Sequence, residues 1–130
     1  MEIEITSLLE TDLFPFSHSQ AEGGENAGQN TWNAALEGPR PLLSTPEQIQ
    51  EFKDWTADFG AWDENERNTW SDNETQALFL QFIAGEVRDT GADSLDEMDW
   101  EAYEEGCEAG RYASHLFKTE DGKIYFNLSR

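Results

Sequence analysis

The sequence has little positive charge and almost no cysteine. Its 130 residues include eight Lys or Arg, two His and one Cys, against 28 Asp or Glu, so the formal net charge is -20. A charge of this size repels nucleic acid and anionic membranes, and it attracts basic surfaces over long distances. The single cysteine, Cys107, excludes an intramolecular disulfide and indicates a reducing compartment.

Long apolar runs are also absent. Residues 1–12 carry acids where a signal peptide carries bases, and no stretch approaches the roughly 18 apolar residues of a membrane span. We therefore expect a cytoplasmic protein that does not contact membranes. The chain is rich in aromatic residues, with five Trp, eight Phe and three Tyr, and disordered acidic chains lack such residues. Its length and aromatic content predict one folded domain.

The residue patterns that support catalysis or metal binding are missing. His18 and His115 lie far apart, and the sequence contains neither H-x-x-x-H nor C-x-x-C. The acidic run 89–101 lacks the spacing of a calcium-binding loop. Cys107 lies close to Glu104, Glu105 and Glu108, whose charges disfavour the reactive thiolate. We predict no metal, no cofactor and no enzymatic activity.

Three segments with the pattern of a capping box predict helix N-termini, at residues 45–48, 71–74 and 94–97. The first precedes apolar residues at helical spacing that end at Gly60. The second precedes the nearly continuous apolar stretch 77–87, which is typical of a buried central helix. The third opens a helix that extends to about residue 109, with Leu95, Met98, Ala102 and Ala109 facing inward and Trp100, Tyr103 and Cys107 beside them. Shorter helices are predicted at 31–36 and 63–70.

The two ends of the chain have strand patterns. Residues 1–9 alternate in part and predict a short strand, and residues 113–128 predict a hairpin around a turn at 120–123. Residues 13–16 form an apolar plug that Pro15 interrupts. The Gly- and Ser-containing stretch 17–30 is interpreted as a mobile loop. The fold class expected is α+β, a small single domain of central helices with a C-terminal β-hairpin.

The negative charge is concentrated in the helical segment. Residues 47–110 contain nineteen acids and three bases, whereas residues 111–130 contain two acids and four bases. In the third predicted helix, Glu97, Glu101, Glu104 and Glu108 fall on one face. Four further acids flank them: Asp93, Asp96, Asp99 and Glu105. Along a straight helix these eight carboxylates span roughly 22 Å, about one per 3 Å, close to one phosphate per roughly 3.4 Å of axis for one DNA strand.

These eight acids are the candidate partner-binding residues. In composition and size the chain resembles the acidic antirestriction and anti-CRISPR type proteins of phages and plasmids, of which the ArdA family is one example. That resemblance implies a DNA mimic, which antagonises host defence by occupying the basic DNA-binding surface of a nuclease complex or other DNA-binding protein. Such a mimic does not bind nucleic acid itself.

Other interpretations stay open. Acidic surfaces also serve solubility and adaptation to high salt. A second hypothesis is a non-catalytic accessory protein, monomeric or homodimeric, that binds its partner through exposed Trp and Phe side chains or through the unusual stretch 25–32. The salt dependence of binding distinguishes the two functional hypotheses. Added salt should lower the affinity of a DNA mimic for its partner steeply, and that of an aromatic contact surface only slightly.

Overall fold

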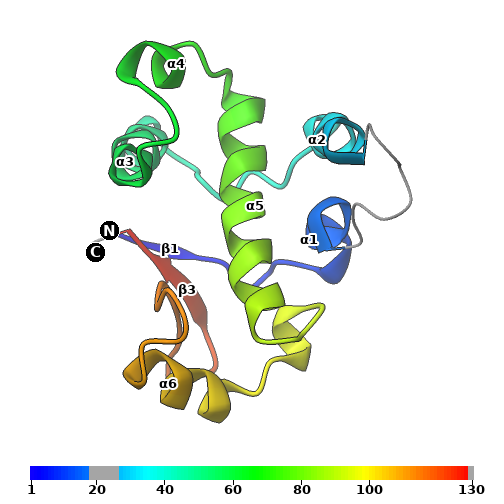
Figure 1. Cartoon of the computed structure of the whole chain (residues 1–130), viewed down its shortest axis with the longest axis vertical. Helices are drawn as coiled ribbons and strands as arrows, with labels where there is room; N and C mark the ends of the chain where they lie inside the picture. Colours follow the sequence, from blue (N-terminus) through cyan, green and yellow to red (C-terminus); the bar gives the residue numbers. More distant parts are fainter. Residues whose placement is uncertain (18–26, 129–130) are drawn as a thin grey trace.

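A long central helix, α5, organises the fold of this protein. The computed structural model describes residues 1–17 and 27–128. In chain order its elements are β1 (Glu2–Glu4), α1 (Glu10–Ser17), α2 (Ala27–Leu36), α3 (Pro46–Thr56), the 3-10 turn η3 (Ala57–Phe59), α4 (Glu64–Asn68), α5 (Asp72–Asp89), the 3-10 turn η4 (Leu95–Glu97), α6 (Trp100–Glu108), β2 (Leu116–Lys118) and β3 (Ile124–Asn127). Helices α1 and α2 lie on one side of α5 and α3 on the other, while α6 and the sheet lie toward its C-terminal end (Figure 1). The predicted α+β class is confirmed.

The capping pattern at residues 71–74 correctly predicts where α5 begins. The Ser71 hydroxyl accepts the Glu74 amide at 3.1 Å, and the Glu74 carboxylate accepts the Ser71 amide at 3.3 Å. The helix is buried along most of its length, with Ala77, Phe79 and Ile83 at 0 % exposure. A helix that is apolar on nearly all faces gains stability only when other elements cover it, and α5 therefore forms the centre of the core.

Helices α3 and α4 begin with single-residue caps. Thr45 accepts the Gln48 amide at 3.1 Å, and Pro46 occupies the first helical position, where its missing amide costs nothing. Asp63 accepts the Glu66 amide at 2.8 Å at the start of α4. Phe52 and Trp55 on α3 contact Phe82 on α5, with ring centroids 5.9 and 5.1 Å apart. The predicted helix 45–60 is present as α3 continued by η3, and the helix predicted at 63–70 is present as the shorter α4.

The sheet has the order β1-β3-β2 and is antiparallel throughout. Ile3, Phe126 and Leu116 are paired across its three strands, and all three side chains are buried. Because side chains alternate between the two faces of a strand, this register directs one apolar face toward the core. The predicted N-terminal strand and C-terminal hairpin are both present, and they form a single sheet.

The N-terminal third is more helical than the sequence predicts. Helix α1 continues through Pro15 to Ser17, where we expected an interrupted plug. Helix α2 begins at Ala27, four residues earlier than predicted. The prediction of a mobile loop at 17–30 is therefore wrong for Ser17 and for residues 27–30, and residues 18–26 lie outside the described residues. Packing of α1 and α2 against each other and against α5 supplies the stability that the local sequence lacks.

Candidate functional site

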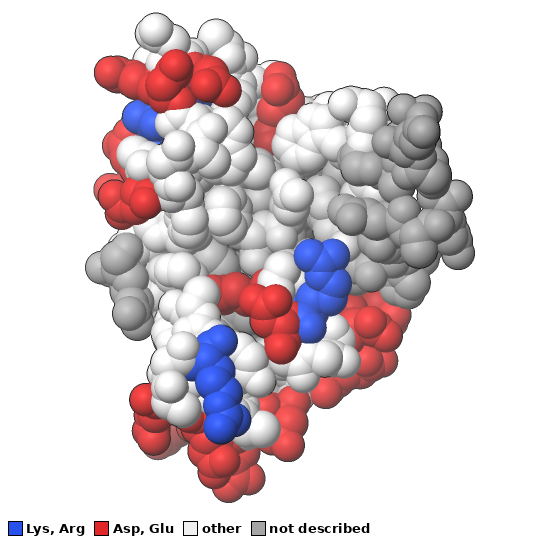
Figure 2. All heavy atoms as spheres, viewed as in Figure 1, with Lys and Arg blue, Asp and Glu red and all other residues white. Residues whose placement is uncertain are grey.

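All eight candidate partner-binding carboxylates are exposed. No ion pair joins any of them to a cation in the described parts of the chain. We call them the acidic surface, and they comprise Asp93, Asp96, Glu97, Asp99, Glu101, Glu104, Glu105 and Glu108. Figure 2 shows acidic side chains gathered along the lower edge, over α6 and the segment before it, and again over α4. The acidic surface therefore faces solvent without a paired cation among the described residues, although Glu97 and Asp99 each accept a backbone amide.

The single long helix predicted from Ser94 is wrong. Ser94 is buried and caps nothing with its side chain, and only the short turn η4 follows it. Met98 then has an extended backbone, with φ -67° and ψ 133°. Helix α6 begins afterwards, and the Asp99 carboxylate caps it by accepting the Ala102 amide at 3.1 Å. The eight carboxylates consequently do not form one straight stripe of about 22 Å.

The inward face of α6 also differs from the prediction. Leu95 and Met98 are buried as expected, but Ala102 is exposed and Ala109 is the exposed C-cap. Tyr103, at 2 % exposure, and Gly106 face the core instead. A tyrosine removes far more apolar surface from water than an alanine does, so this helix is rotated to bury the ring. Glu101, Glu104 and Glu108 remain on its outer side.

Tyr103 fixes the position of α6. Its hydroxyl accepts the backbone amide of Leu116 at 3.2 Å, which ties the helix to β2. Its ring stacks on Tyr112 with centroids 5.5 Å apart and 15° between the planes. Burial, followed by the nearby Glu86 charge, raises the pKa of Tyr103 far above its usual range, so the hydroxyl stays protonated. The outward direction of the α6 carboxylates thus follows from a buried anchor.

Carboxylates remain densely spaced on α6 even though the helix is short. Glu101, Glu104, Glu105 and Glu108 fall within seven helical steps, roughly 10 Å along the axis at about 1.5 Å per residue. Four carboxylates in that length give a mean spacing along the helix axis of roughly 3.5 Å, which is near the axial rise per phosphate of one DNA strand. The spacing inferred from the sequence therefore survives on α6 alone. The other four acids lie on the bent segment that leads into it.

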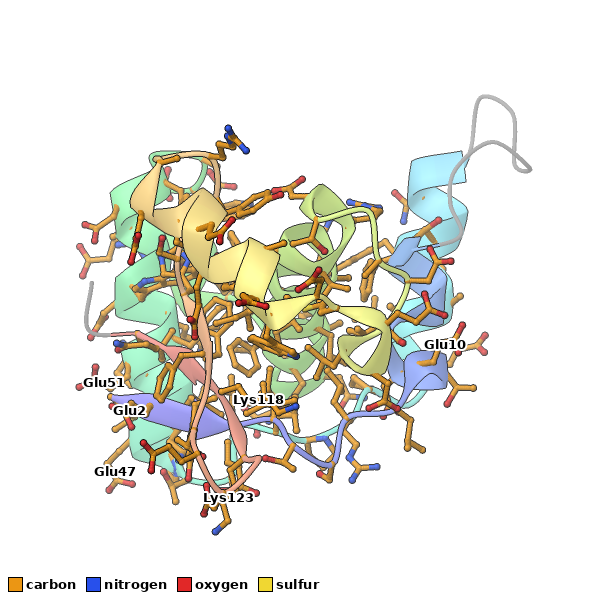
Figure 3. All side chains as sticks on the ribbon, turned by 90° about the horizontal axis from the view of Figure 1, so that it is seen from below. Glu2, Glu10, Glu47, Glu51, Lys118 and Lys123 are labelled. Atoms are coloured by element: carbon orange, nitrogen blue, oxygen red, sulfur yellow. The ribbon has the colours of Figure 1, made fainter. Side chains whose placement is uncertain are left out.

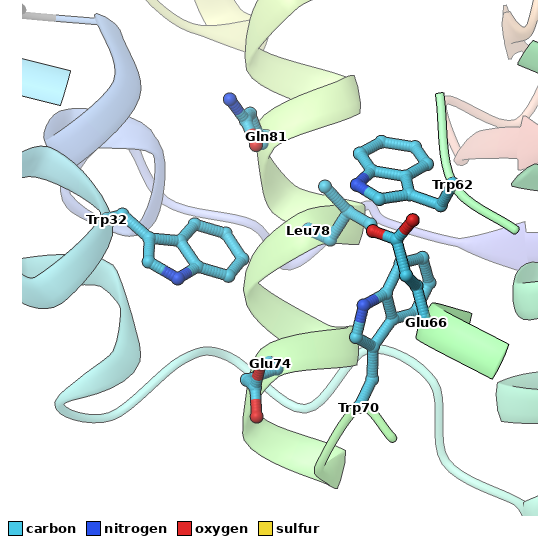
Figure 4. Close-up of a pocket in the computed structure, with 7 residues that line it drawn as sticks. All are labelled: Trp32, Trp62, Glu66, Trp70, Glu74, Leu78 and Gln81. Atoms are coloured by element: carbon cyan, nitrogen blue, oxygen red, sulfur yellow. The ribbon is translucent and has the colours of Figure 1, made fainter. Parts of the chain in front are cut away.

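A second surface feature is an aromatic hollow beside α5. We call it the tryptophan pocket; its volume is about 400 Å³ and it is lined by Trp32, Trp62, Glu66, Trp70, Glu74, Leu78 and Gln81. Figure 4 shows Trp32 on one side of α5 and Trp62 and Trp70 on the other, with Leu78 between them. The Trp62 and Trp70 rings meet edge to face, with centroids 5.4 Å apart. These half-buried rings are accessible from solvent.

An adjoining groove extends this hollow along α5. It has a volume of about 420 Å³, shares Trp62, Leu78 and Gln81 with the tryptophan pocket, and includes Phe59 and Phe82. Phe59 is 47 % exposed, an unusual position for a large apolar ring. In Figure 2 the surface over the middle of α5 is largely free of charged side chains. The acidic surface and the aromatic hollow are therefore separate features.

The groove also borders a buried carboxylate–imidazole pair. His115 Nδ1 lies 2.6 Å from Glu86 Oε1, and the His115 ring packs against Trp55 and Phe126 at centroid distances of 5.0 and 5.3 Å. The other oxygen of Glu86 is buried and has no hydrogen-bond partner among the described residues. Such a pair can orient an imidazole for proton transfer. Within residues 1–17 and 27–128, however, no hydroxyl or thiol is hydrogen-bonded to His115.

The described residues contain no group of three or more His, Cys, Asp or Glu side chains placed to hold a metal ion. Cys107 is partly buried and unpaired. Across the same residues, none of the helices combines the length and apolar character that a membrane span requires.

No family model matches this sequence, and no curated protein or solved structure matches it.

Sequence reasoning missed the tryptophan pocket and the Glu86–His115 pair. Trp62 and Trp70 lie in connections before and after α4, where helical periodicity gives no direction to a side chain. The sequence did contain one indication of the pocket: Trp62 and Trp70 are large aromatic residues in a polar segment, and neither belonged to the predicted core. For the pair, the signal was Glu86 itself, a charged residue inside the apolar stretch 77–87, where a buried partner is expected.

Proposed function

We propose that this protein is a non-catalytic DNA mimic, which inhibits a DNA-binding protein or nuclease complex by occupying its basic DNA-binding surface. The observation that carries the proposal is the set of four exposed carboxylates on α6, which form no ion pair with the described residues, have a mean axial spacing close to that of phosphates, and are flanked by four more. A cationic groove that binds a phosphate backbone would attract such a surface by the same Coulomb interactions.

The concentration of negative charge on α6 costs stability, which supports a functional role for it. Like charges three or four residues apart on a helix each destabilise it by a few tenths of a kcal/mol. Helix α6 carries no Lys or Arg to offset that repulsion. Solubility alone would be served equally by mixed charges, which do not repel one another. Binding to a basic partner relieves the repulsion, and electrostatic attraction makes the encounter fast.

The test is a charge reversal on α6. A binding partner is first isolated from bacterial lysate at low salt, and duplex DNA is then titrated against its complex with this protein. The test variant replaces Glu101, Glu104, Glu105 and Glu108 by Lys, which has a helix propensity close to that of Glu. The matched control makes the same replacement at Glu2, Glu10, Glu47 and Glu51, which are exposed on β1, α1 and α3 (Figure 3).

We expect DNA and this protein to exclude each other from the partner. The α6 variant should bind at least about tenfold more weakly than the parent, because a surface of several charge pairs is inverted. Single Glu→Gln changes should each have little effect, since exposed pairs contribute about 0–1 kcal/mol each. If both quadruple variants lose affinity equally, only net charge matters and the acidic surface is not the binding site. Circular dichroism establishes that both variants fold.

A further inference from the structure

The tryptophan pocket has the composition of a site for an organic cation. Its described lining includes three Trp rings, two carboxylates and no Lys or Arg. A cation over the face of Trp gains about 0.5–2 kcal/mol, the most of any aromatic residue. The Glu66 side chain makes no hydrogen bond or ion pair with another described residue, and Figure 4 shows its carboxylate beside Trp62 and Trp70. The carboxylates and the tryptophan faces therefore both favour a positively charged organic ligand.

Glu74 adds a second acceptor at the other end of the pocket. One of its oxygens accepts the Ser71 amide, which fixes the carboxylate at the start of α5. Arg67 is not among the residues that line the pocket; its guanidinium donates to the Trp62 carbonyl at 2.8 Å and so holds the loop that carries this ring. The three tryptophans therefore surround a space that two carboxylates make negative.

The shape of the surface indicates that the cation belongs to a polypeptide. The pocket continues into the groove that contains Phe59 and Phe82, and the two together, at about 400 and 420 Å³, are larger than any one cationic group requires. The groove is mainly apolar, although Glu86, Arg88 and Asp89 also line it. Its Phe59 and Phe82 rings suit a leucine or an aromatic side chain. Guanidinium groups stack on aromatic faces and pair with carboxylates in two-point geometry, so arginine fits better than lysine.

We propose that this surface docks a basic, apolar segment of a partner protein, with an arginine in the tryptophan pocket and a large apolar side chain over Phe59 and Phe82. Charge complementarity selects this occupant over a second copy of the chain, because two molecules of net charge -20 repel each other. The inference does not rest on DNA mimicry, since α6 and α4 lie toward opposite ends of α5 (Figure 1).

The test uses the full chain and a nine-residue peptide of arginine, leucine and alanine, acetylated and amidated at its ends. A second peptide has citrulline, the neutral isostere of arginine, at every arginine position, and tetramethylammonium serves as a small cation. Binding is followed by tryptophan fluorescence and calorimetry. The double variant Glu66→Gln/Glu74→Gln removes both charges, and the amide that replaces the Glu74 carboxylate can still cap α5. Its matched control is Glu47→Gln/Glu51→Gln on α3.

The arginine peptide should bind at least about tenfold more tightly than the citrulline peptide, because only arginine offers a cation–π contact and charge-assisted hydrogen bonds to the two carboxylates. The pocket double variant should lose that preference, and the α3 control should keep it. Three results would overturn the proposal: equal binding of both peptides, equal loss in the two double variants, or binding of tetramethylammonium as tight as that of the peptide. The variant Trp70→Leu provides a second check: it should weaken peptide binding and reduce the fluorescence response, which Trp32 and Trp62 still supply in part, while circular dichroism shows an intact fold.

Discussion

Replacement by Ala should change the free energy of unfolding in opposite directions at two helical glycines, Gly85 and Gly106. A Cβ added at Gly106 on α6 overlaps Cε2 of Tyr112 and lies 2.5 Å from its Cδ2, whereas one added at Gly85 on α5 meets no described atom within 4 Å apart from its chain neighbours and the backbone of its own helix. Ordinary contact between carbon atoms is about 3.5–4.0 Å. Gly106 is therefore small because the Tyr112 ring lies against it, and Gly85 is under no such constraint.

The magnitudes follow from these contacts. Replacing Gly by Ala within a helix stabilises it by about 1 kcal/mol, so Gly85→Ala should raise the free energy of unfolding by that amount. At Gly106 the ring must move, which costs about 1–3 kcal/mol of overpacking and weakens the Tyr103–Tyr112 stack by about 1 kcal/mol. We expect Gly106→Ala to destabilise the protein by about 1–3 kcal/mol net, because the helix-propensity gain offsets only the weakened stack.

Urea unfolding of four variants beside the parent provides the assay: Gly85→Ala, Gly106→Ala, Tyr112→Ala and the double variant Gly106→Ala/Tyr112→Ala. In the Tyr112→Ala background the clash is gone, so adding Gly106→Ala should now stabilise by about 1 kcal/mol. If Gly106→Ala stabilises the parent as much as Gly85→Ala does, Tyr112 does not pack on α6. The orientation of the acidic surface would then need a different explanation.

Two further predictions concern buried polar contacts. His115→Ala should lower the free energy of unfolding by about 3 kcal/mol, because it leaves the Glu86 carboxylate buried without its partner. The double variant Glu86→Leu/His115→Phe should recover most of that loss in urea unfolding, and failure to do so would mean that packing of the imidazole dominates. Gln76 bonds both the amide and the carbonyl of Leu43, at 3.1 and 2.7 Å. Gln76→Leu leaves both of these backbone groups without a partner, so it should lower the free energy of unfolding by about 2–4 kcal/mol in urea. A loss below about 1 kcal/mol would contradict this role of Gln76.

The parts of the fold that the sequence predicts well are those in which local and tertiary preferences agree. At Ser71 a complete capping box precedes an apolar stretch that is long enough to be buried, and α5 begins there. The hairpin likewise combines strand residues with Gly122, whose φ of 86° suits a tight turn. In both cases neighbouring residues specify the same structure that the core requires.

The acidic segment shows where local reasoning fails. Ser94 and Asp99 are both competent helix caps, and their intrinsic preferences are similar. The choice between them depends on burying Leu95, Met98 and Tyr103 together, which the backbone achieves by an extended residue at Met98. Burial of Tyr103 in turn depends on contacts with β2 and Tyr112. Periodicity within the acidic segment contains no information about those contacts. Exposure of the eight carboxylates was predictable, because isolated charges are rarely buried.

The tryptophan pocket was unpredictable for a related reason. Trp32, Trp62 and Trp70 come from three separate segments, and only the packing of α2 and α4 around α5 brings them to one place. Composition indicated that some aromatic residues would lie at an interface, but it could not indicate which ones share a surface.

Competition at two salt concentrations tests the central claim most directly. Labelled protein bound to its isolated partner is titrated with unlabelled duplex DNA at about 50 mM and about 200 mM salt, since screening weakens charge-dominated binding over this range. Mimicry predicts complete displacement by DNA, together with a loss of affinity of about tenfold or more at the higher salt. A complex that retains the protein in the presence of saturating DNA, with affinity unchanged by salt, would contradict the proposed function.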